Sequence, residues 1–99
     1  MQTEVDKWIN NHKSSYWKPH EILARISEEN GELAREINHK YGPKKKKDNE
    51  SEGRISEELG DILFSIICMA NSEGISLDKS FGEAMEKCYG RDDKRFEKL

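Results

Sequence analysis

The sequence has few of the residues that build a large hydrophobic core or a membrane-spanning segment. Only 33% of its 99 residues are hydrophobic, whereas 37% are charged. The longest apolar run, from Ile62 to Ala70 and interrupted by Ser65, is far too short to cross a bilayer. Met1 to Asn10 contains no apolar stretch of the kind that signal peptides carry. We therefore expect a cytoplasmic protein without a membrane partner.

Cysteine is scarce as well, and an excess of positive charge is absent. Cys68 and Cys88 lack the spacing of a zinc site and fall within apolar helical patterns, which predicts buried, reduced thiols. The formal net charge is −3, whereas surfaces that bind nucleic acid are broadly basic. The four consecutive lysines at 44–47 are typical of a solvated turn. The composition thus argues against nucleic acid as a partner.

No stretch alternates in the manner of a β-strand, and every periodic stretch has helical spacing. We predict helices at about residues 3–13, 19–40, 53–72 and 76–89, with a flexible loop at 43–52. Pro19 suits the first position of the second helix. Gly42 and Gly74 suit helix ends, and Ser76 can cap the fourth helix. The predicted fold is all-α: a single four-helix, bundle-like domain over residues 1–99.

A chain of this size and composition has little apolar surface with which to stabilise a core. Most of the circumference of the third helix is apolar, so we expect this helix to be buried on most sides, with a cleft along one lane of acidic and small residues: Glu58, Asp61, Ser65 and Ser72. The apolar residues on one side cluster around Leu59: Ile55, Ile62, Leu63, Ile66 and Ala70. We expect homo-oligomerisation, as a homodimer or a homotetramer, to complete the core.

Two acidic pairs, Glu29-x-x-Glu32 and Glu58-x-x-Asp61, are the most informative motifs. Residues three apart on a helix lie about 60° apart around its axis, so each pair can point at one ion. In an antiparallel helical hairpin the numbers of facing residues have a constant sum, which Glu29 with Asp61 and Glu32 with Glu58 satisfy. Four facing carboxylates would form an all-oxygen site that suits Mg²⁺, with Mn²⁺ as a possible substitute.

Other interpretations of these acids remain open at this point. The chain has 20 acidic residues, so pairs at this spacing also arise by chance on exposed helices. A di-iron site would need two Glu-x-x-His motifs. Glu36-x-x-His39 provides one, but neither His12 nor His20 has a glutamate three positions earlier. Of the metal sites considered, a magnesium site fits the sequence best.

The acidic segments and their surroundings resemble a known family. Glu28-Glu29-x-x-Glu32, Glu58-x-x-Asp61 and Ala70-Asn71 before Gly74 are similar to the signature of the MazG-like, all-α nucleotide pyrophosphohydrolases. The resemblance covers about residues 5–96 and is closest to the small, single-domain YpjD-like branch. It implies Mg²⁺-dependent hydrolysis of a nucleoside triphosphate to the monophosphate and pyrophosphate, in house-cleaning or in control of the nucleotide pool.

The resemblance also implies roles for individual residues. It assigns the metal to Glu29, Glu32, Glu58 and Asp61. Either Glu28 or Glu32 would accept the proton of the attacking water. Asn71 resembles a substrate-contacting asparagine, and Trp17 matches a base-pocket position, although a core or interface role for Trp17 is an alternative. On the last helix and tail, four-residue steps place three cations on one side, where they could meet the phosphates or simply form a solvated basic face: Lys87, Arg91 and Arg95.

The sequence leaves the preferred base and sugar open, because the chain is shorter than the dUTPase and dCTPase branches of this superfamily. A second hypothesis is a catalytically weak nucleotide-binding module or a helical protein-interaction module. A third is a structural bundle with surface acids. The complete set of four carboxylates favours the enzyme.

Overall fold

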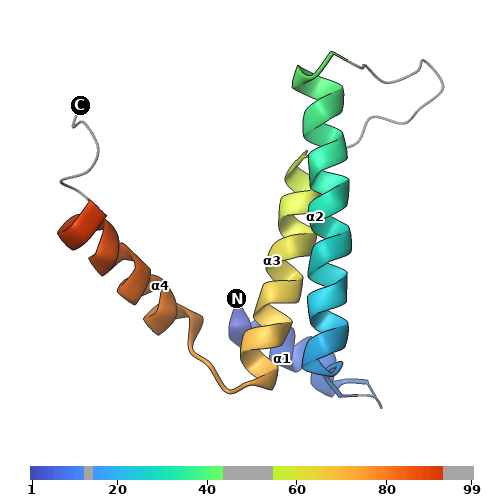
Figure 1. Ribbon diagram of the computed structural model, residues 1–99. Coiled ribbons are helices and arrows are strands. Elements are labelled where there is room, and N and C mark those ends of the chain that lie inside the picture. The colour runs from blue at the N-terminus through green and yellow to red at the C-terminus, as the bar shows by residue number, and fades with distance from the viewer. Residues whose placement is uncertain (13–14, 44–54, 93–99) are drawn as a thin grey trace.

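The computed structural model describes residues 1–12, 15–43 and 55–92, and this part of the chain is helical, with no strand (Figure 1). Its elements are α1 (Gln2–Asn10), α2 (Pro19–Tyr41), α3 (Ile55–Ser72) and α4 (Leu77–Lys87), followed by a π-helical turn, η1 (Cys88–Asp92). The prediction of an all-α fold with four helices is confirmed. Most of the predicted loop at 43–52 lies outside the described residues.

The helices α2 and α3 run antiparallel along most of their length, and α1 crosses the end of this pair where α2 begins and α3 ends (Figure 1). The helix α4 follows a short connection and extends away from the pair (Figure 1). The single chain therefore has a three-helix body and a projecting fourth helix.

The helix ends follow the local chemistry of the sequence. Pro19 occupies the first turn of α2, where the Lys18 backbone N–H donates to the Glu21 carboxylate at 3.1 Å. Gly74 has a φ of 68° and ends α3 as predicted. The Ser76 side chain accepts a hydrogen bond from the Lys79 backbone N–H at 3.3 Å and caps α4. Gly42 caps the end of α2 with a negative φ, so the position does not require the left-handed conformation of glycine. It requires a small residue, because a Cβ there would lie 2.6 Å from the Asn38 carbonyl oxygen.

The core lies between α2 and α3 and is small. Its buried apolar residues are Ile22, Ile67, Cys68 and Ala70, and Glu29 and Ser65 are buried with them. Of the acidic and small residues along one side of α3, Glu58 lies beside Glu29 and Glu32 of α2 and Ser65 is buried, whereas Asp61 and Ser72 are exposed. The apolar side of this helix is left at the surface, with Leu59 54% exposed and Leu63 and Ile66 also exposed.

The expectation that this side of α3 is buried is therefore right for Ala70 and wrong, in the single chain, for Leu59, Leu63 and Ile66. Helical periodicity shows that a helix has an apolar side, but it does not show which neighbour covers that side. Within the described residues, α2 packs against the side of α3 that carries Glu58. The other described helices leave Leu59, Leu63 and Ile66 exposed.

A polar network fixes α1 against the end of α3. The Gln2 side chain donates to the Asn71 Oδ1 and to the Ile75 carbonyl oxygen, both at 2.8 Å. The Leu77 backbone N–H donates to the Gln2 Oε1 at 2.8 Å, which ties in the start of α4. The Asn71 amide donates to the Tyr16 hydroxyl at 2.8 Å, and that hydroxyl donates to Asp6. These bonds position the segment that joins α1 to α2.

The apolar side of α4 is also exposed. Phe81 is 67% exposed and Cys88 lies at the surface, whereas Cys68 on α3 is buried. The prediction of a buried thiol is thus right for Cys68 and wrong for Cys88 in the single chain, because the described residues place no helix against that side of α4. Among the described helices, none combines the length and the apolar character that crossing a membrane would require.

Candidate metal and nucleotide site

Three carboxylates converge between α2 and α3. Glu29 and Glu32 project from α2 and Glu58 from α3, and one oxygen of each lies within 4.8 Å of the others. Glu29 is only 5% exposed, Glu58 is half-buried and Glu32 is at the surface. The one-turn spacing within α2 and the antiparallel pairing with α3 together explain why these side chains meet. Below, this group is called the carboxylate cluster.

Two oxygens of the cluster are buried without a hydrogen-bond partner among the described residues, namely the Oε2 atoms of Glu29 and Glu58. Burying an ionised carboxylate oxygen is unfavourable unless a proton or a cation compensates the charge. Carboxylate oxygens are the ligands that Mg²⁺ and Mn²⁺ prefer. The donor set and the orphaned oxygens therefore fit a divalent cation.

The protonation of Glu58 reflects the same crowding. Loss of hydration, together with the neighbouring Glu29 and Glu32 carboxyl groups, raises the pKa of Glu58 from 4.5 to about 7. A carboxyl group with such a pKa holds a proton at slightly acidic pH where an ordinary glutamate is ionised. A cation that binds the cluster must displace this proton.

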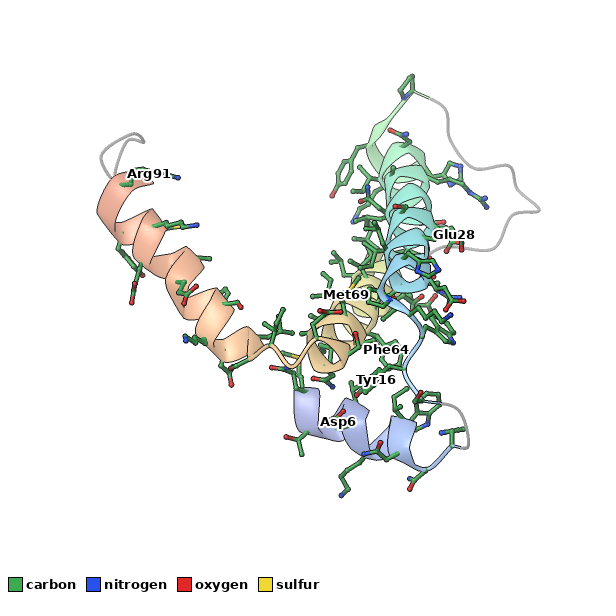
Figure 2. The ribbon with its side chains drawn as sticks, turned by 60° about the horizontal axis from the view of Figure 1, so that its bottom comes forward. Asp6, Tyr16, Glu28, Phe64, Met69 and Arg91 are labelled. Atoms are coloured by element: carbon green, nitrogen blue, oxygen red, sulfur yellow. The ribbon has the colours of Figure 1, made fainter. Side chains whose placement is uncertain are left out.

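The other two acidic residues predicted for the site, Glu28 and Asp61, are exposed and lie outside the group of three. Glu28 lies on α2 (Figure 2), one residue before Glu29 in the sequence. Asp61 lies one turn after Glu58 on α3 and lines a small cavity described below. Their roles as base and ligand stay predictions.

A cavity of about 360 Å³ lies between α1, the segment that follows it, and the α2–α3 pair. Its wall is largely aromatic, and Figure 2 labels two of its residues, Tyr16 and Phe64. A smaller cavity of about 60 Å³ shares five of the lining residues and reaches Asp61. The lining residues common to both cavities are Trp17, Ile22, Arg25, Phe64 and Cys68. An aromatic cavity of this size suits a flat organic group.

Sequence reasoning missed Arg25. Its Nε lies 3.1 Å from the Glu29 Oε1, and its guanidinium lies over the Trp17 ring, 5.8 Å from the ring centre. The spacing of four residues between Arg25 and Glu29 was the available signal for the ion pair. Trp8, His12 and Tyr16 were not predicted to line a cavity either, because the fold of α1 over the pair determines their place.

The predicted substrate-binding residues are not gathered in one place. Trp17 lies at the cavities, whereas Asn71 is half-buried and hydrogen-bonded to Gln2 and Tyr16. Arg91 lies in η1, beyond the end of α4 and far from the α2–α3 pair (Figure 2), and Lys87 is the last residue of α4. Arg95 lies outside the described residues. The single chain thus does not bring the cations of α4 to the carboxylate cluster.

Comparison with known proteins identifies the family. The family model of the MazG nucleotide pyrophosphohydrolase domain matches residues 18–96, a span that contains the carboxylate cluster. This chain belongs to the MazG nucleotide pyrophosphohydrolase family. The prediction that the protein is a hydrolase of nucleotide phosphoric anhydrides is thereby confirmed, as is the resemblance stated from the motifs.

Individual relatives are similar to this chain, in sequence and in structure, over most of its length. The uncharacterised protein YpjD of Bacillus subtilis (strain 168) is 46% identical over 96 residues, which cover 97% of this chain and 86% of the relative. A crystal structure of YpjD from Bacillus subtilis has a TM-score of 0.77 at 48% identity, covering 87% of this chain and 88% of that one. A crystal structure of the Bacillus-conserved MazG protein, a nucleotide pyrophosphohydrolase, has a TM-score of 0.73 at 47% identity, covering 88% and 83%.

Proposed function

We propose that residues 1–99 form a single Mg²⁺-dependent nucleoside triphosphate pyrophosphohydrolase domain, in which Mn²⁺ can replace Mg²⁺. The reaction converts an NTP or dNTP and water to the monophosphate and pyrophosphate, for house-cleaning or nucleotide-pool control in the cytoplasm. The observation that carries the proposal is the carboxylate cluster, which has two buried oxygens without partners among the described residues and lies near an aromatic cavity.

Different residues of the chain would bind the metal and accept the proton of the attacking water. Glu29, Glu32, Glu58 and Asp61 would hold the cation, which when bound would offset phosphate charge and lower the pKa of a water molecule. Glu28 or Glu32 then accepts the proton of the attacking water, since both are exposed carboxylates on the same stretch of α2. The proton acceptor and the metal ligands therefore lie within two turns of α2 and one of α3.

The cavity supplies the place for the base. Trp17 and Phe64 offer flat apolar surfaces, and Asp61 on the smaller cavity points to a continuous path from the base to the metal ligands. Asn71 either positions Tyr16, which lines the cavity and accepts a hydrogen bond from the Asn71 amide, or contacts the substrate directly.

The active form is a homodimer or a homotetramer. The exposed apolar sides of α3 and α4 support this proposal, because a single chain leaves Leu59 and Phe81 largely in water. Packing α4 of one copy against the α2–α3 pair of another would also bring the expected phosphate ligands toward a site: Lys87, Arg91 and Arg95.

The same exposed apolar sides favour one alternative, a catalytically weak nucleotide-binding module whose α4 contacts another protein. The test is pyrophosphate release from a panel of canonical and modified dNTPs and NTPs, with and without Mg²⁺. We expect release from at least one nucleotide, its loss with EDTA, and its loss in Glu58→Gln. Glu4→Gln, which changes an exposed acid on α1, is the matched control and should retain activity. Absence of release from every nucleotide would favour the binding module.

A further inference from the structure

Arg25 contacts both the carboxylate cluster and the aromatic wall of the cavity. It lies one helical turn before Glu29 on α2, and its Nε is 3.1 Å from the Glu29 Oε1. Its guanidinium also lies over Trp17, with 5.8 Å to the ring centre, which is within cation–π range. It lines both cavities. One planar cation thus touches a carboxylate of the cluster and an aromatic wall of the cavity.

The ion pair holds one oxygen of Glu29 and leaves the other available. Arg25 takes Oε1, while Oε2 is buried without a hydrogen-bond partner among the described residues. A planar guanidinium fixes the orientation of a carboxylate better than a flexible ammonium does. The arrangement therefore restrains the rotation of the Glu29 carboxylate and keeps Oε2 free for a cation.

Helix stability does not explain the pair. On a helix, an acid four residues before a base interacts more favourably than the reverse order, and here the base comes first. The Arg25 side chain is also 48% exposed, so solvent screens its charge, although the Glu29 side chain is only 7% exposed. What distinguishes this pair is its location between the carboxylate cluster and Trp17.

We propose that Arg25 is a positioning residue that orients the Glu29 carboxylate for the metal and the Trp17 ring for the nucleobase. One side chain would thus position both a metal ligand and a wall of the base cavity. This inference rests on the proposed function. For a variant without the Arg25 guanidinium, it predicts weaker metal binding, whereas the loss of positive charge alone would predict tighter binding. Removing a cation beside a cation site strengthens metal binding by electrostatics, whereas losing the partner that orients a ligand typically weakens it about 10- to 100-fold.

The test compares Arg25→Met, Arg25→Lys and Arg35→Met in the full chain. Arg35 is an exposed arginine on the same helix and provides the matched control. Mn²⁺ affinity is measured from the electron paramagnetic resonance signal of free Mn²⁺, which requires no turnover. We expect Arg25→Met to weaken binding about 10-fold, Arg25→Lys to recover part of the loss, and Arg35→Met to match the wild type. Equal or tighter binding by Arg25→Met would overturn the proposal.

The link to Trp17 is tested by fluorescence in a Trp8→Phe background, where Trp17 is the remaining tryptophan. We expect Mg²⁺ to change the Trp17 emission and Arg25→Met to abolish this change. No response before the Arg25 substitution, or an unchanged response after it, would overturn the link. Wild-type protein that binds Mn²⁺ but hydrolyses no nucleotide would refute the proposed function alone. Normal hydrolysis with unaltered Mn²⁺ affinity in Arg25→Met would refute the role of Arg25 alone.

Discussion

The α2–α3 pair and α4 both have the apolar pattern of a helix that packs against a neighbour, but only the pair finds its neighbour within the described chain. In the pair, Ile22, Ile67 and Cys68 are buried. In α4, Phe81 is exposed although it lies on the apolar side of the helix. The comparison shows that an amphipathic pattern indicates a need for a partner and does not identify the partner.

The comparison also divides the proposed site. The carboxylate cluster and the cavity belong to the three-helix body. Lys87, at the end of α4, and Arg91 (Figure 2) are the described cations expected to meet the phosphates, and both belong to the projecting part. Metal binding should therefore depend on the α2–α3 pair alone, whereas catalysis should depend on both parts. The following predictions test this division, from the largest expected effect to the smallest.

The largest effect is expected from a truncation in the core of the pair. Ile22 is 1% exposed, so Ile22→Ala should lower the free energy of unfolding by about 3 kcal/mol through lost burial and a residual cavity. Met85→Ala, a truncation on the partly exposed α4, should cost less than about 1 kcal/mol in the dissociated chain. Urea denaturation at low protein concentration measures both. Equal losses would show that α4 is as well packed as the pair.

The second effect concerns the metal. Glu29→Gln keeps the shape of the side chain and removes its charge, and it should weaken Mn²⁺ binding at least about 100-fold, at or above the loss from outer-shell changes. Calorimetric titration measures the affinity, and Glu83→Gln on α4 is the control that should leave it unchanged. Tight binding by Glu29→Gln would move the metal site away from the cluster.

The positions of the helices and the carboxylate cluster could both be predicted from the sequence. Helical periodicity and the residues Pro19, Gly74 and Ser76 were enough to place the helices, because they act through local backbone geometry. The spacing of Glu29, Glu32 and Glu58 was enough to predict a cluster, because one turn of a helix and an antiparallel register bring such residues together.

Tertiary placement was not accessible in the same way. The side of α3 that faces α2 depends on how two helices rotate about their axes, and an apolar stripe and an acidic lane compete for that interface. The role of Arg25 was missed because its second contact, Trp17, lies before the start of α2, where helical geometry no longer predicts direction. The course of α4 depends on a surface that the described single chain does not provide.

The third effect concerns assembly. Phe81→Asp places a charge on the apolar side of α4 and should weaken subunit association by roughly 2 kcal/mol or more, as expected for an aromatic residue central to an interface. Pyrophosphate release should fall with it, while Mn²⁺ affinity should persist. Light scattering and titration measure the two outcomes. Lys79→Asp, on the opposite side of α4, is the control. A wild-type protein that is monomeric at micromolar concentration would refute the oligomer.

The smallest effect is a pH dependence. Because the pKa of Glu58 is about 7 in the folded, metal-free protein and about 4.5 when unfolded, the folded state holds an extra proton between these values. The free energy of unfolding should therefore decrease as pH rises from about 4.5 through 7, and stabilisation by Mg²⁺ should increase over the same window. Thermal melts with EDTA or Mg²⁺ at several pH values measure this, and Glu58→Gln should flatten the trend. A Mg²⁺ effect that is independent of pH would contradict the assignment of Glu58 as a ligand.

The central claim is that the carboxylate cluster binds the cation and the neighbouring cavity binds the base of the same nucleotide. Anomalous diffraction from crystals grown with Mn²⁺ and a non-hydrolysable triphosphate tests it most directly. We predict a manganese peak bounded by Glu29, Glu32 and Glu58, with the base beside Trp17. Manganese bound elsewhere, or a base outside the cavity while the triphosphate occupies the cluster, would contradict the account.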